Sequence, residues 1–225
     1  MNIVITGAGR GIGFECIKQF ASKGHTIIAI SRNINAIERL NNPNIFALQA
    51  DITHAENMQA IANTVATRFG TIDILINNAG VLINKAFAEY SVADARRIFE
   101  VNFFSPALLI QKLLPYLQSG SHILNIGSMG GYMGSIKFPG LAYYSASKAA
   151  LANLTECLAE ELKDTGIRIN CLALGSAQTE MLAEAFPGYQ SPVSASQMAT
   201  FITDFAINGS KLFNGKVLPV SVATP

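Results

Sequence analysis

Tyr144 and Lys148 stand four residues apart at the start of a helical pattern that runs over residues 144–163. Residues at this spacing share one face of a helix, so both side chains can reach one site. A free tyrosine has a pKa of about 10 and keeps its proton near neutral pH. A neighbouring ammonium group favours the phenolate, which brings a tyrosine closer to a useful general acid or base. The pair predicts proton transfer, although the spacing alone also arises by chance.

A glycine-rich segment lies between the first β-branched run, residues 2–6, and the first helical pattern. Its glycines fit the spacing GxxxGxG, and they do not fit the stricter GxGxxG. Glycine permits positive φ and close approach of the backbone to a pyrophosphate, and a helix N-terminus offers free N–H groups. An ordinary glycine-rich turn is the alternative, but so many glycines at a strand-to-helix junction favour a phosphate-binding loop. The expected cofactor contacts of this loop are Gly7, Gly9, Arg10, Gly11, Ile12 and Gly13.

The next predicted strand indicates which dinucleotide binds. A ribose 2′-hydroxyl calls for an acidic side chain roughly 20 residues after the glycines, and no Asp or Glu occurs between Glu15 and Glu38. Arg32 can meet a 2′-phosphate and Ser31 can donate a hydrogen bond to it, while Arg10 adds a second positive charge. Arg32 could instead be a solvated residue at the start of a loop. The missing carboxylate favours NADP over NAD.

Short β-branched runs that alternate with longer helical patterns must position these residues. The runs show little alternation of apolar and polar residues, which is typical of parallel strands buried on both faces. Strand and helix alternate along the chain, which gives right-handed βαβ units and ligand sites at the carboxyl ends of the strands. The predicted fold class is α/β, a Rossmann-like doubly wound parallel sheet with helices on both faces, in a single domain of residues 1–225. Strands are expected at residues 2–6, 26–31, 45–49, 72–77, 122–127, 168–174 and 216–220, and helices at residues 11–23, 34–40, 55–69, 92–117, 144–163 and 196–207.

Charge, hydropathy and cysteine content argue against several classes of protein. The chain has 225 residues, with 16 basic against 15 acidic side chains and no basic block or stripe, so nucleic acid and membrane are not expected partners. The longest apolar stretch, residues 101–117, is too short and too polar to span a bilayer. Cys16, Cys157 and Cys171 have neither metal-ligand nor disulfide spacing. Together with the lack of a signal peptide, these features predict a cytoplasmic protein without a metal site.

Three motifs occur in an order and spacing that resemble the short-chain dehydrogenase/reductase family, in its compact single-domain form. They are the glycine loop at residues 6–13, the run Asn-Asn-Ala-Gly at residues 77–80, and the Tyr-x-x-x-Lys pair at residues 144–148. The resemblance covers nearly the whole chain. It implies an oxidoreductase that passes a hydride between a nicotinamide cofactor and a small carbonyl compound or alcohol.

The same resemblance implies roles for individual residues. Ser128 orients the substrate oxygen, Tyr144 exchanges a proton with it, Lys148 lowers the pKa of Tyr144 and holds the nicotinamide ribose, and Asn102 holds a water in a proton relay. Taken alone, Asn102 could be a structural residue in a helix kinked at Pro106, and Ser128 could simply end a strand. The further implied cofactor contacts are Asp51 and Ile52 beside the adenine ring, Asn78, Ala79 and Gly80 beneath the cofactor, and Gly175 and Thr179 at the nicotinamide.

The chain departs from the family pattern at three places. The interval from Ser128 to Tyr144 is longer than usual, and the excess is expected at residues 135–138, beside the mouth of the site. The usual Pro-Gly after the sixth strand is Leu174-Gly175 here. The usual glycine-rich tail after the last strand is missing, so a homodimer is as plausible as a homotetramer.

Side chains near the reacting carbonyl are expected to form a mainly apolar cleft for a small-molecule substrate with an apolar body. Two other classes stay open, namely an NADP-binding sensor or scaffold without turnover, and a non-redox epimerase or dehydratase on the same fold. The intact set of Asn102, Ser128, Tyr144 and Lys148 argues against the first. The lack of room for a longer substrate domain argues against the second. The candidate pocket residues are Leu82, Met129, Tyr132, Met133, Phe138, Met181, Leu182, Phe186 and Tyr189.

Overall fold

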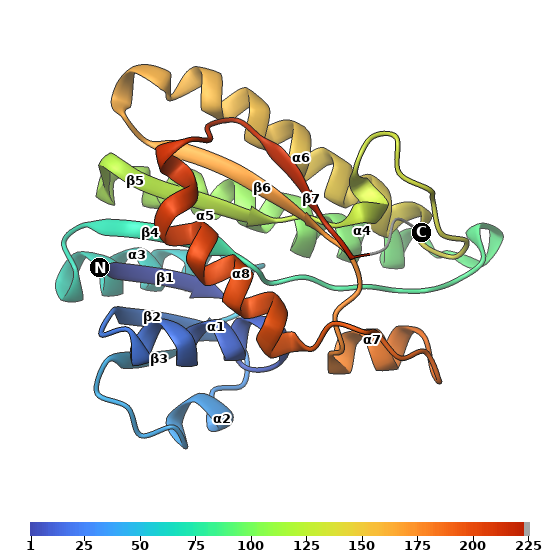
Figure 1. The fold of residues 1–225 in the computed structure, drawn as a ribbon, viewed down its shortest axis with the longest axis horizontal. Helices are drawn as coiled ribbons and strands as arrows, with labels where there is room; N and C mark the ends of the chain where they lie inside the picture. Colours follow the sequence, from blue (N-terminus) through green and yellow to red (C-terminus); the bar gives the residue numbers. More distant parts are fainter. Residues whose placement is uncertain (223–225) are drawn as a thin grey trace.

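A computed structural model describes residues 1–222; residues 223–225, at the end of the predicted domain, lie outside the described residues. Its centre is a parallel seven-stranded sheet in the order β3-β2-β1-β4-β5-β6-β7 (Figure 1). The predicted α/β, Rossmann-like fold class is therefore confirmed. The strands are β1 Asn2–Thr6, β2 Thr26–Ser31, β3 Ile45–Gln49, β4 Ile72–Asn77, β5 Leu117–Ile126, β6 Arg168–Leu174 and β7 Val217–Val220. The helices are α1 Gly11–Ser22, α2 Asn35–Glu38, α3 Ala55–Arg68, α4 Val92–Phe99, α5 Ser105–Leu113, α6 Ala142–Glu161, α7 Glu180–Ala185 and α8 Ala195–Asn208.

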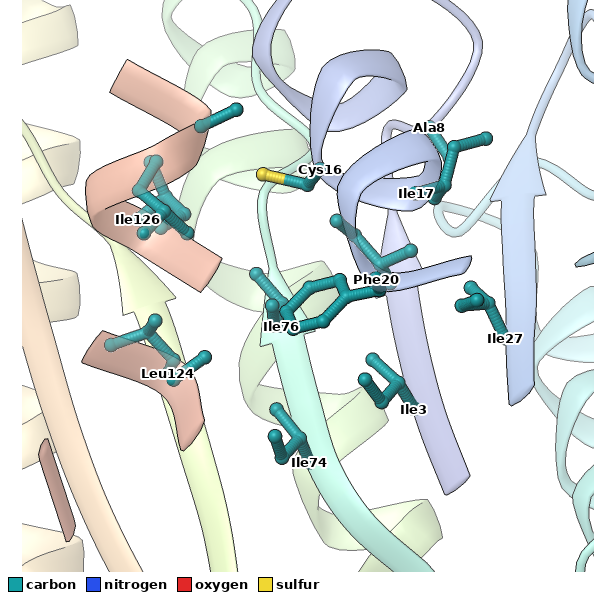
Figure 2. Close-up of a cluster of buried hydrophobic side chains, with 14 of the residues drawn as sticks. Ile3, Ala8, Cys16, Ile17, Phe20, Ile27, Ile74, Ile76, Leu124 and Ile126 are labelled. Atoms are coloured by element: carbon teal, nitrogen blue, oxygen red, sulfur yellow. The ribbon is translucent and has the colours of Figure 1, made fainter. Parts of the chain in front are cut away.

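Helices cover both faces of the sheet, and each face has its own apolar core. Helices α1 and α8 pack on the face that is nearer in Figure 1, while α3, α5 and α6 pack on the other. On the first face, the ring of Phe20 from α1 lies among Ile3, Ile74 and Ile76 of the sheet (Figure 2). Because central strands are buried on both faces, their sequences are almost continuously apolar.

The strand order reverses between β1 and β4, since β2 and β3 lie on one side of β1 and the later strands lie on the other. At such a switch point, neighbouring connections leave the sheet in opposite directions and a crevice opens at the carboxyl ends of the strands. Thr6 ends β1 and Asn77 ends β4. The glycine loop and the Asn-Asn-Ala-Gly run therefore meet at this point.

The single helix predicted over residues 92–117 is wrong. The structure divides this stretch into α4, a π-helical segment Glu100–Phe104, α5, and a short 3₁₀ turn Leu114–Tyr116. Pro106 has no N–H to donate to the carbonyl of Asn102, so a regular α-helix cannot continue through this point. The π-helical segment absorbs the break and carries Asn102.

Two further elements differ from the prediction. Strand β5 begins at Leu117, five residues before the expected start, because Leu117 pairs with Ile72 across a register irregularity. The sequence did not indicate this extension, because the residues between Leu117 and Ile123 are polar or glycine and lack the apolar pattern of a buried strand. Helix α7 was not predicted, since it has only six residues and its start depends on Thr179, whose side chain accepts the N–H of Leu182 at 3.2 Å.

Over residues 1–222, no helix combines the length and apolar character needed to cross a bilayer. The same residues contain no cluster of three or more His, Cys, Asp or Glu side chains arranged as metal ligands.

Candidate active site

A cleft of 1940 Å³ lies at the carboxyl ends of the strands. It brings together every predicted catalytic and cofactor-binding residue except Asn102, which is completely buried. The predicted residues that line it are Gly7, Gly9, Arg10, Gly11, Ile12, Gly13, Ser31, Arg32, Asp51, Ile52, Asn78, Ala79, Gly80, Ser128, Tyr144, Lys148, Gly175 and Thr179.

The glycine loop has the properties that a bound pyrophosphate requires. Gly7 and Gly11 have φ of +70° and +56°, a conformation that favours glycine. A Cβ on Gly13 would overlap the carbonyl oxygen of Gly7, so the loop is tightly folded against the start of α1. Among residues 1–222, no side chain caps the N-terminus of α1, and its first turn holds no acidic residue. Its free N–H groups can therefore receive an anion, and the residues present fit a dinucleotide.

Thr6 joins the glycine loop to the run after β4. Its hydroxyl oxygen accepts the backbone N–H groups of Asn78 and Ala79, each at 3.1 Å. The side chain of Asn78 donates in return to the carbonyl oxygens of Thr6 and Gly7, at 3.0 and 3.1 Å. This network positions residues 78–80 beside the loop. Sequence reasoning did not single out Thr6, because its role depends on the adjacency of β1 and β4.

The far end of the cleft carries the residues expected near the adenosine. Ser31 packs directly against Gly9, where even a Cβ would overlap the serine hydroxyl. Arg32 is exposed and lines the cleft beside Asp51. Burial raises the pKa of the Asp51 carboxyl, but hydrogen bonds from Thr53 and the charge of Arg32 more than compensate and lower it. Asp51 is therefore an ionised acceptor at neutral pH.

Arg10 forms an ion pair that the sequence did not predict. Its guanidinium donates to both carboxylate oxygens of Glu184 on α7, at 2.5 and 3.3 Å. Both side chains are more than half exposed. Glu180, the first residue of α7, also raises the pKa of Arg10 through its charge. Arg10 lines the cleft as predicted, and it also links the glycine loop to α7.

Tyr144 and Ser128 both line the cleft, on the side formed by the end of β5 and the start of α6. Ser128 follows β5 and its hydroxyl accepts the N–H of Gly130 at 3.2 Å, which fixes the short turn after the strand. Tyr144 lies in the first turn of α6 and is partly buried. Burial raises the pKa of Tyr144, and a hydrogen bond with Ser128 opposes this rise. Both side chains line the cleft, so they can act on a substrate bound there.

Lys148 lies one helical turn after Tyr144, and its side chain is almost completely buried, at 4% exposure. Its ammonium group donates to the carbonyl oxygen of Ile126, the last residue of β5, at 2.8 Å. Burial lowers the pKa of Lys148 to about 8. The amine is therefore mostly protonated at pH 7 and loses its proton as the pH rises through about 8.

Asn102 lies behind the cleft instead of in its wall. Its Oδ1 accepts the N–H of Val81 at 2.8 Å, and its Nδ2 donates to the Val81 carbonyl at 2.9 Å and to Ser147 at 3.0 Å. A Cβ on Gly80 would come within 3.3 Å of Asn102 Oδ1 and 3.5 Å of Lys148 Nζ, so these groups flank Gly80. Protein atoms engage both amide hydrogens and one of the two lone pairs of the amide oxygen. The expected role of Asn102 in holding a water of the proton relay remains a prediction.

The wall beside Tyr144 is apolar. Helix α7 supplies part of it, and the loop before α6 contributes Phe138, from the predicted longer interval. Tyr132 and Met133 were expected here, but neither lines the cleft, and Met133 is 91% exposed on the outer surface of that loop. The lining side chains are Leu82, Met129, Phe138, Met181, Leu182, Phe186 and Tyr189, as predicted, together with Val81, Leu141, Pro192 and Phe201, which the sequence had not indicated.

Comparison with known proteins gives the family. A family profile described as short chain dehydrogenase matches residues 1–190. The chain belongs to the short-chain dehydrogenase family. This short-chain dehydrogenase is 35% identical over 188 residues to the 7α-hydroxysteroid dehydrogenase of Escherichia coli strain K12, covering 80% of this chain and 72% of that protein.

Two solved structures resemble this short-chain dehydrogenase over almost their full lengths. One is a 3-ketoacyl-(acyl-carrier-protein) reductase from Brucella melitensis complexed with NADH, with a TM-score of 0.87, 26% identity, and coverage of 97% of this chain and 96% of that one. The other is ElxO with NADP bound, with a TM-score of 0.86, 28% identity, and coverage of 97% and 96%. The protein is thus an oxidoreductase of this family, whose structural neighbours bind both forms of the nicotinamide cofactor.

Proposed function

We propose that this short-chain dehydrogenase depends on NADP and transfers a hydride between nicotinamide and a small carbonyl compound or secondary alcohol. One observation carries the proposal: Ser128, Tyr144 and Lys148 line the same cleft as the glycine loop and the free N-terminus of α1. A proton-transfer pair and a dinucleotide cradle that share one cleft suit hydride and proton transfer to one substrate.

In the direction of reduction, Ser128 donates a hydrogen bond to the carbonyl oxygen of the substrate, and Tyr144 donates a proton to it. In oxidation, Tyr144 receives that proton from the alcohol. When bound, the nicotinamide supplies the hydride in reduction and accepts it in oxidation. The glycine loop and residues 78–80 hold the dinucleotide beside this reacting oxygen.

We propose that Lys148 adds to the effect of Ser128 and helps to offset the effect of burial on the pKa of Tyr144. Burial raises the pKa of the tyrosine, which opposes proton release. A protonated lysine one turn away favours the phenolate and counters this rise. Because burial also lowers the pKa of Lys148 to about 8, this support weakens as the pH rises through 8. We expect proton release by Tyr144 to depend on the charge of Lys148.

The preference for NADP rests on charge at the adenosine end. Arg32 and Ser31 line the cleft there, and β2 ends without the carboxylate that an NAD ribose would engage. Among residues 1–222, Arg32 takes part in no ion pair. Its guanidinium is therefore available for the dianionic 2′-phosphate.

The substrate class follows from the wall beside Tyr144. The side chains named above are apolar, and the other charged side chains that line the cleft include Arg96, Arg97 and Glu100. Ketones, aldehydes and secondary alcohols with an apolar body fit this wall better than charged substrates. The similarity to a hydroxysteroid dehydrogenase is consistent with an apolar alcohol.

We also propose a homo-oligomer, either a dimer or a tetramer. Phe104, which ends the π-helical segment, and Leu108 of α5 are 46% and 47% exposed. Exposed apolar side chains of this kind suit a subunit interface. Sedimentation velocity tests this directly, and a monomer at micromolar concentration would refute it.

The experiment that tests the proposed function measures binding and turnover in parallel. The wild type is titrated with NADPH and NADH, followed by fluorescence, and is then assayed with apolar ketones and aldehydes. We expect Tyr144→Phe to abolish turnover while NADPH still binds, and we expect Arg32→Ala to weaken NADPH about 10- to 100-fold, since charge-assisted pairs contribute about 1.5–3 kcal/mol.

The control is Arg68→Ala, which removes an exposed arginine that stacks on Phe46 outside the cleft. Equal losses of NADPH and NADH affinity in Arg32→Ala would refute the NADP preference. NADPH binding without turnover of any carbonyl compound would favour a sensor or scaffold instead.

A further inference from the structure

Ser147 lies on α6 between Tyr144 and Lys148 and is completely buried. Its hydroxyl donates to the backbone carbonyl of Tyr144 at 2.7 Å. It accepts the side-chain amide N–H of Asn102 at 3.0 Å. A serine hydroxyl has one hydrogen, so donation to Tyr144 leaves its oxygen to receive the amide. The direction of both hydrogen bonds is thereby fixed.

Both amide hydrogens of Asn102 are donated to protein acceptors. Its oxygen accepts the N–H of Val81, and its two amide hydrogens are given to the Val81 carbonyl and to Ser147. A chain of hydrogen bonds therefore runs from the loop after β4, through the π-helical segment, to the first turn of α6. Loss of the Ser147 hydroxyl would leave a buried amide N–H without a partner.

Among residues 1–222, no side-chain cap holds the start of α6. Leu141, at the N-cap position, makes no side-chain cap, and the loop before it is the longer interval identified in the sequence. Tyr144 lies in this turn, and Lys148 follows one turn later. Ser147 thus ties the catalytic helix by hydrogen bonds to the π-helical segment behind Gly80.

We propose that Ser147 is a positioning residue, which holds the first turns of α6 so that Tyr144 and Lys148 keep their reactive placement. The inference rests on the proposed function, because Ser147 acts through Tyr144. A shift of the reacting group by about 1 Å is enough to cost about 100-fold in rate. A hydrogen bond that fixes this turn therefore affects turnover more than binding.

Ser145 provides a matched control on the same helix. Its hydroxyl oxygen is buried but has no hydrogen-bond partner among residues 1–222, and it lies against Gly130. Ser145→Ala and Ser147→Ala each remove one hydroxyl group, at positions two residues apart on α6. Only the second breaks the connection to Asn102.

The experiment measures kcat, KM and the Kd for NADPH with an apolar ketone that the wild type reduces. We expect Ser147→Ala to lower kcat about 10-fold or more, with KM and Kd within about twofold of the wild type. Ser147→Thr keeps the hydroxyl and should restore most of kcat. Ser145→Ala should stay within about twofold in all three quantities.

A double-mutant cycle covers the case in which Ser147→Thr fails to fold. In the Asn102→Ala background, Ser147→Ala should lower kcat by less than about twofold, because its partner is already gone. Additive losses, an unchanged kcat in Ser147→Ala, or an equal loss in Ser145→Ala would each overturn the positioning role while leaving the proposed function intact. A wild type that binds NADPH but reduces no carbonyl compound would refute the proposed function, and the role of Ser147 with it.

Discussion

Lys148→Met should make the folded protein more stable near neutral pH while it abolishes turnover. Lys148 is 4% exposed, and burial lowers its pKa from 10.5 to about 8. Keeping it charged in the folded state therefore costs about 3 kcal/mol at pH 7, at 1.36 kcal/mol per pKa unit. Methionine has a similar length and no charge. The resulting gain in the free energy of unfolding is smaller by about 1–3 kcal/mol, because the Ile126 carbonyl loses its hydrogen bond from Lys148.

The pH dependence separates these two contributions. The folded-state pKa of Lys148 lies below its unfolded value, so between pH 8 and 10.5 the unfolded chain binds more protons than the folded one. The stability of the wild type therefore rises with pH through this window relative to the methionine variant. We expect the difference between the two proteins to change by about 1 kcal/mol from pH 7 to pH 9, whereas the lost hydrogen bond contributes equally at both.

The assay is urea denaturation followed by circular dichroism, at one protein concentration and at pH 7, 8 and 9. Lys112→Met is the control, because Lys112 is exposed on α5. Its stability difference from the wild type should stay constant over this range. A constant difference for Lys148→Met as well would refute the conclusion that Lys148 is charged and buried at a cost to stability.

Two other predictions concern the cofactor cradle. Gly13→Ala should weaken NADPH and NADH alike by about tenfold or more, since its Cβ would overlap the Gly7 carbonyl and both cofactors share the pyrophosphate; a selective loss of NADPH in a fluorescence titration would contradict this. Glu184→Gln releases Arg10 from its ion pair and should tighten NADPH about two- to fivefold more than NADH, the range expected for an exposed pair worth at most about 1 kcal/mol. An unchanged ratio of the two affinities in calorimetry would mean that Arg10 does not reach the 2′-phosphate.

The sequence determined the local features of the site. The i, i+4 spacing of Tyr144 and Lys148 places both on one face of α6 whatever the helix packs against. The glycines after β1 allow the positive φ angles of a tight strand-to-helix turn, and the order of strands and helices favoured a doubly wound topology. These features depend on neighbours in the chain, and for that reason they could be predicted.

The tertiary structure decided which side chains meet across elements. The π-helical segment has two causes. Pro106 interrupts the helix locally, and Asn102 forms hydrogen bonds with Val81 and Ser147, which are distant in the sequence. The pairing of Arg10 with Glu184 joins residues 174 positions apart, and no periodicity in the sequence indicates such a contact. Helix α7 is too short for a helical pattern, and the early start of β5 depends on its pairing with β4. Hydrogen bonds and ion pairs between distant segments exist only after the sheet has brought those segments together, and so the sequence alone could name the reacting residues but not the contacts that hold them.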